Sequence, residues 1–157
     1  MPVGTVLGLI CIRSASGIDG AVFDALAALP PKVEVPEIAS VIESVKALPG
    51  VLAAIDAARS DPDDLYLTFF TTGDRAHAAW PGIGQSTEMR PDQSAELAVS
   101  VEFNFSQNVS LFDHDFSRDD HLGSITMLAE EQGNGQIAKF AHSSVEGSAY
   151  YITYEVN

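Results

Sequence analysis

Apolar and polar residues alternate over much of the second half of the chain, which is the pattern of strands that bury one face. A period of two places every second side chain on the core side of a sheet. Shorter apolar runs rich in β-branched and aromatic residues add further strands. Together the expected strands cover residues 5–15, 65–72, 97–105, 109–112, 125–128, 136–142 and 149–156. About eight short strands separated by turns predict a mainly β fold, an eight-stranded antiparallel β-sandwich.

Residues 20–59 interrupt this pattern, because alanine becomes frequent and the apolar spacing turns helical. A first helix over about 20–29 ends at Pro30-Pro31. A second begins near Pro36, and a third covers 51–59. The second helix has one apolar stripe, formed by Ile38, Val41, Ile42, Val45 and Leu48. Such a segment is too small for its own core. We therefore expect one domain over residues 1–157, with a helical insert packed onto the strands.

Turn residues predict how the later strands connect. Ser106-Gln107-Asn108 separates two alternating runs, which indicates a tight turn and a hairpin between 97–105 and 109–112. Residues 75–90 show no clear period and predict a loop with one irregular strand. The second strand of this hairpin is followed directly by a strongly acidic segment.

The charge of the chain restricts its partners. It contains 8 Lys and Arg against 22 Asp and Glu, for a formal net charge of −14. This excludes nucleic acid and simple electrostatic attachment to anionic lipid, since both need basic residues. Cys11 is the only cysteine, so an intrachain disulfide and a thiolate zinc cage are excluded. No signal-peptide pattern and no membrane-length apolar run occurs, so we expect a soluble protein, by default cytoplasmic.

The acidic segment places four carboxylates within eight positions: Asp113, Asp115, Asp119 and Asp120. Like charges this close repel one another unless a cation lies among them. Short carboxylates on a loop are the oxygen ligands that calcium prefers. The simpler interpretation is an acidic, solvated hairpin loop.

Two distant aspartates strengthen the calcium hypothesis. Asp19 follows the first expected strand, and Asp61 precedes the second. Loops at one end of a sandwich can converge, and calcium needs six to eight oxygens. An EF-hand starting at Asp113 fails, because Arg118 and Ser124 stand where that loop needs Gly and Glu. A zinc site using His114 and His121 is conceivable from the residue types alone.

Four short motifs appear in an order that resembles the C-two domain family, the calcium-dependent lipid-binding β-sandwiches of the protein kinase C type. These motifs are Asp19, Ser60-Asp61-Pro62, Phe112-Asp113-His114-Asp115 and Asp120-His121-Leu122-Gly123. The resemblance covers residues 5–19 and 60–156. It implies Asp19, Asp61, Asp113, Asp115 and Asp120 as calcium ligands. The later loop is one residue shorter than the commonest family pattern, which makes Asp119 a rival for Asp120, and residues 20–59 interrupt the first calcium loop.

Two functions follow as hypotheses. In the first, the chain is a calcium-binding module that docks on phospholipid membrane in a calcium-dependent way. In the second, it is a calcium-stabilised module that binds a protein partner through the helical insert, without lipid. Since no nucleophile–base pair can be argued from spacing, we expect no enzymatic activity.

Overall fold

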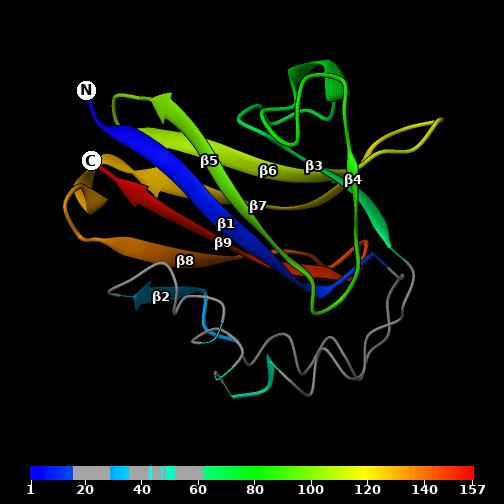
Figure 1. The fold of residues 1–157 in the computed structure, drawn as a ribbon, viewed down its shortest axis with the longest axis horizontal. Helices are drawn as coiled ribbons and strands as arrows, with labels where there is room; N and C mark the ends of the chain where they lie inside the picture. Colours follow the sequence, from blue (N-terminus) through cyan, green and yellow to red (C-terminus); the bar gives the residue numbers. More distant parts are fainter. Residues whose placement is uncertain (16–28, 36–42, 44–46, 48, 52–61) are drawn as a thin grey trace.

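The strands form two antiparallel sheets that pack face to face in a sandwich-like arrangement (Figure 1). A computed structural model describes residues 1–15, 29–35, 43, 47, 49–51 and 62–157, and these are mainly β, as predicted. The sheet orders are β2-β8-β9-β1-β5 and β4-β3-β6-β7. The strands are β1 (Val3–Arg13), β2 (Lys32–Val35), β3 (Asp63–Thr68), β4 (Thr87–Met89), β5 (Ser94–Glu102), β6 (Ser106–Asp113), β7 (Asp120–Leu128), β8 (Gln136–Ser143) and β9 (Ser148–Val156).

The core lies between the two sheets, where alternate side chains of each strand face inward. The first sheet contributes Val6, Leu9, Cys11, Ile152 and Tyr154, and the second contributes Leu65, Leu67, Leu111, Ile125 and Met127. Each of these side chains is buried. Burial of this apolar surface is the main driving force for holding the sheets together.

A second apolar cluster covers the outer face of the five-stranded sheet. Ile10, Ile12 and Tyr151 point away from the main core and pack with Leu29 and Val51. The central strands β1 and β9 are therefore buried on both faces, which explains their continuous apolar runs. Leu29 and Val51 lie within the expected insert, so these two described residues of that segment pack onto the sheet.

The predicted helices of the insert lie largely outside the described residues. Among the described residues of 20–59, one strand is defined, β2, and it pairs antiparallel with β8. The sequence interpretation missed this strand. A buried carboxylate, Glu131 of the 3-10 helix η3 (Ala129–Glu131), links β2 to β8. It forms an ion pair of 3.2 Å with Lys32 of β2 and another of 2.8 Å with Lys139 of β8. Four residues are too few for periodicity to identify, and it is pairing with β8 that defines β2.

The expected hairpin between β5 and β6 is wrong. β5 pairs with β1 in the five-stranded sheet, whereas β6 pairs with β3 and β7 in the other sheet. The chain crosses between sheets at residues 103–105, and Ser106-Gln107-Asn108 begins β6 instead of forming a turn. Local turn chemistry does not reveal whether the second strand returns beside the first or joins the opposite sheet. Within 75–90, the 3-10 helix η2 (Arg75–His77) and short β4 match the expected loop with one irregular strand.

One end of the sandwich carries the acidic connections, and the other carries the chain termini (Figure 1). Val3 and Asn157 exchange backbone hydrogen bonds of 2.8 and 2.9 Å at the terminal end. The β6–β7 connection, yellow in Figure 1, projects from the opposite end. Among the described residues, no helix is long and apolar enough to cross a membrane.

Gly123 allows the edge strand β7 to lie against β8. Its φ of 142° is a conformation that side chains disfavour. A Cβ placed there would lie 2.6 Å from the carbonyl carbon of Ala141, which is rigid strand backbone. The Leu-Gly step that follows the acidic loop is therefore required where the two sheets meet along this side.

We expect Gly123→Ala to lower the free energy of unfolding by about 3 kcal/mol or more, because backbone strain and steric overlap add. Gly133→Ala is the matched control, since Gly133 also has a positive φ but no atom lies within 4 Å of the position that its methyl group would occupy. That control should cost about 1–2 kcal/mol. Urea unfolding of both variants tests this, and equal losses would contradict the role of the β7–β8 approach.

Candidate functional site

The acidic loop closes the hairpin between β6 and β7. Asp113 pairs with Asp120 across the two strands, so these residues lie opposite each other at the base of the loop. Residues 114–119 form the connection, and Asp115 is exposed within it. The structure therefore brings Asp113 and Asp120 together and places Asp115 above them.

Asp113 lies in a crowded negative environment. Its Oδ1 accepts a hydrogen bond of 2.7 Å from the Asp64 amide, and the His114 amide donates to the Asp64 carbonyl at 2.8 Å. Burial raises the pKa of the Asp113 carboxyl, and the negative charges of Asp64, Asp120 and Asp115 raise it further. A positive charge at this position would relieve that repulsion.

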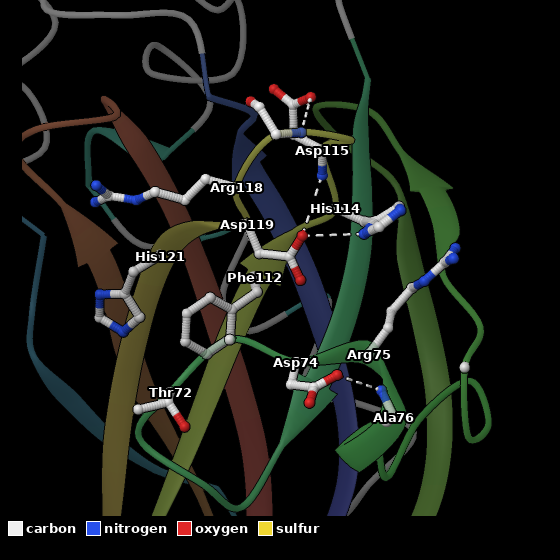
Figure 2. Close-up of a pocket in the computed structure, with 13 residues that line it drawn as sticks. Thr72, Asp74, Arg75, Ala76, Phe112, His114, Asp115, Arg118, Asp119 and His121 are labelled. Atoms are coloured by element: carbon white, nitrogen blue, oxygen red, sulfur yellow. Dashed lines mark hydrogen bonds and ion pairs between the residues drawn. The ribbon is translucent and has the colours of Figure 1, made fainter.

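Asp119 has a different role, because both of its oxygens bind within the protein. Figure 2 shows the contacts of one of these oxygens, to His114 and Asp115. The Tyr66 hydroxyl donates to Oδ2, while Oδ1 lies 3.0 Å from His114 Nδ1 and 3.2 Å from the Asp115 amide nitrogen. Burial alone would raise the pKa of Asp119, but these hydrogen bonds outweigh it and lower the pKa. Asp119 therefore holds the loop in its observed shape.

Asp115 and Asp120 are less engaged. From the described residues, the Asp115 carboxylate accepts only a long bond of 3.4 Å, from the Ser117 amide. The Asp120 carboxylate has no hydrogen bond to any described residue, although its negative charge acts on both Asp113 and Glu146. Among the described members of the expected ligand set, these two carboxylates are the most available for a new contact.

Asp63 is a further carboxylate at this end, and the sequence interpretation did not single it out. It is 1% exposed and joins the two sheets: the Ala15 amide donates to its Oδ1 at 2.9 Å, and the Tyr150 hydroxyl donates to its Oδ2. Burial raises the pKa of Asp63 to about 7 in spite of these hydrogen bonds, with Asp113 and Asp64 adding to the rise. One signal was present in the sequence, because Asp63 stands two residues before inward-facing Leu65 and so shares its face.

Two cavities flank the loop. A cavity of about 870 Å³ extends over Phe112 and is bordered by Arg75, Arg118 and His121. A second, of about 520 Å³, lies on the other side of His114 and is lined by Asp64, Asp113 and Asp115. Figure 2 shows that the guanidinium groups of Arg75 and Arg118 point to opposite sides of the first cavity. Carboxylates line both cavities: Asp74, Asp115 and Asp119 border the first, and Asp64, Asp113 and Asp115 border the second.

Of the six expected ligands, Asp19 and Asp61 lie outside the described residues. Within the ranges that are described, no three His, Cys, Asp or Glu side chains form a group that could hold a metal ion. The zinc site considered with His114 and His121 is therefore not formed by the described residues either. His114 is bound to Asp119, and His121 packs on Phe112 with ring centroids 5.2 Å apart.

Comparison with known proteins gives no family for the chain: no protein-family model matches it, and neither does any curated protein.

The raised pKa of Asp63 predicts a pH dependence of stability. Between about pH 4 and pH 7 the folded state retains a proton that the unfolded state has released, so the free energy of unfolding falls as pH rises. Asp63→Asn removes this titration. Relative to the wild type, the stability of Asp63→Asn should rise by about 4 kcal/mol across that window.

Chemical denaturation at a series of pH values, with chelator present, measures this difference. Glu102→Gln is the control, because Glu102 is an exposed carboxylate of β5 at the terminal end of the sandwich, opposite Val3. Its stability should follow the wild-type pH profile closely. A constant difference between Asp63→Asn and wild type at all pH values would show that Asp63 ionises normally in the folded protein.

Proposed function

We propose that this chain is a calcium-binding β-sandwich module that docks on anionic phospholipid through the end carrying the β6–β7 loop. The observation that carries the proposal is the crowding of half-buried Asp113 by other carboxylates: burial raises its pKa, and the negative charges of Asp64, Asp120 and Asp115 add to the rise. Carboxylates that destabilise one another without a cation gain the most when one binds.

The donor set fits calcium better than a transition metal. Asp113, Asp115 and Asp120 offer only oxygen atoms, and flexible oxygen-rich loops suit calcium. Asp119 fits poorly as a ligand, because its oxygens already bind Tyr66, His114 and the Asp115 amide. We assign it the task of positioning the loop. Since calcium needs six to eight oxygens, the proposal also requires Asp19, Asp61, carbonyl groups or water.

Two exposed apolar side chains support docking on a membrane at this end. Phe116 is fully exposed in the acidic loop, and Val145 is 72% exposed in the turn between β8 and β9. The two connections are neighbours, since the charges of Arg118 and Asp120 act on Glu146. With a net charge of −14 the chain repels anionic lipid, so attachment needs the charge reversal that bound calcium supplies.

The protein-partner hypothesis has weaker support. It requires the insert to present apolar side chains to a partner, yet Leu29 and Val51 are buried against the five-stranded sheet. A partner would have to use other residues of the insert.

Calcium binding should be detectable by isothermal titration calorimetry and should disappear in Asp113→Asn with Asp115→Asn. Glu34→Gln with Glu130→Gln is the matched control, since it removes two exposed carboxylates elsewhere and should bind as wild type does. Wild-type heats in the first double variant would disprove the site.

The same titration separates the neighbouring aspartates. Asp120→Asn should weaken calcium binding while leaving calcium-free stability nearly unchanged, because its carboxylate has no hydrogen bond to a described residue. Asp119→Asn should lower calcium-free stability by about 1–3 kcal/mol, since hydrogen bonds to a charged group are lost. The reverse result would make Asp119 the ligand.

Membrane docking is tested by flotation with vesicles containing phosphatidylserine. Flotation should require calcium, and Phe116→Ser should reduce it without changing the calcium heats. Phe105→Ser is the control, because Phe105 is 85% exposed at the opposite end of the sandwich. Calcium binding without flotation would reject the lipid half of the proposal and favour a protein partner.

A further inference from the structure

β5 is a long strand at the edge of the five-stranded sheet, and one of its sides is unpaired among the described strands. It has nine residues, and β1 is the only described strand with which it pairs (Figure 1). No backbone hydrogen bond from residues 94–102 to any other described element is present. Along an antiparallel edge, alternate amide and carbonyl groups point away from the partner strand. β5 therefore presents a row of backbone donors and acceptors that can accept another strand.

The usual protections of an exposed edge are weak on β5. Edge strands avoid unwanted pairing by being short or by carrying lysine, proline or inward-pointing charges. β5 has no lysine or proline, and its inward positions are apolar: Ala95, Leu97, Val99 and Val101. The pairing with β1 is irregular between Val6 and Gly8, yet exposed and inward positions still alternate along all of β5.

The inward positions leave apolar surface for an added strand to cover. Ala95, Val99 and Val101 are only partly buried, although all three pack against the main core. A cavity of about 280 Å³, lined by Trp80, Met89 and Ala95 among others, adjoins the start of the strand. An added strand with apolar residues at alternate positions would bury this surface.

The exposed face of β5 is acidic. Glu96 and Glu102 point to the same exposed face, and neither forms an ion pair with a described residue. Between residues 87 and 105 the chain has four carboxylates and one basic residue, Arg90. Opposite charges on neighbouring strands stabilise their pairing, and like charges oppose it. A partner strand should thus carry basic residues on this face.

From these features we infer that β5 binds an extended basic segment of another protein by strand addition. The segment alternates apolar residues, which face the core, with polar ones, and it places two basic residues six positions apart, opposite Glu96 and Glu102. Main-chain hydrogen bonds provide the attachment and the alternate side chains provide the selectivity. A second copy of this chain is the poorer occupant, because each copy carries a net charge of −14.

The probe is the peptide acetyl-Lys-Val-Thr-Val-Thr-Val-Lys-amide, titrated into the whole chain with chelator present and followed by isothermal titration calorimetry. Binding should weaken about fivefold in Glu96→Gln with Glu102→Gln, because exposed ion pairs contribute modestly, and should vanish in Glu96→Lys with Glu102→Lys. Glu34→Gln with Glu130→Gln, which removes the same charge elsewhere, should bind as wild type does. Equal weakening in that control would overturn the assignment to β5.

Strand addition is separated from simple charge attraction by two measurements. Replacing the central valine of the peptide by proline removes an amide donor while keeping both lysines, and it should abolish binding. Hydrogen exchange of β5 amides should slow when the parent peptide binds. The proposal is overturned if exchange of the β5 amides does not change or if the proline peptide binds. It is also overturned if the chain forms a dimer that the Glu96→Lys, Glu102→Lys variant disrupts.

Discussion

The packing of two sheets through their inward-facing side chains is the constraint on which the rest of this structure depends. It determines the direction of each side chain, because every strand must direct alternate positions toward the other sheet. At Asp63 this requirement places a carboxylate in the core, where the Ala15 amide and the Tyr150 hydroxyl satisfy it. The same contact ties β3 to the end of β1 and to β9. The acidic end is therefore built on a buried polar connection between the sheets.

The neighbouring carboxylates show how environment divides one residue type into different roles. Asp119 is held by three donors and its pKa is lowered, whereas the pKa of Asp113 is raised by burial and by negative neighbours. Asp120 is close in sequence to Asp119 but keeps a carboxylate without hydrogen bonds to described residues. A loop of this kind has one aspartate that maintains its shape and others that carry unrelieved charge. That division is the physical basis for proposing a cation site here.

Much of the fold could be predicted from periodicity. Most strands lie within a few residues of their expected positions. The β5–β6 hairpin was wrong because turn residues report a local reversal of the chain but not the sheet that the next strand joins. β2 was missed because four residues give too short a pattern. For the site, the residue types identified the acidic loop, but the distinct surroundings of Asp63 and Asp119 depend on Tyr150 and Tyr66, which are distant in sequence.

The sequence by itself determined the β class, the strong negative charge and the concentration of carboxylates between two strands, because composition and short-range period suffice for these. Only the tertiary structure decided which carboxylates are engaged, which strand forms an open edge, and that Gly123 must lack a side chain where β7 lies against β8. Each of these depends on contacts between segments far apart in the chain. Residue order specifies such contacts only through the complete packing of both sheets.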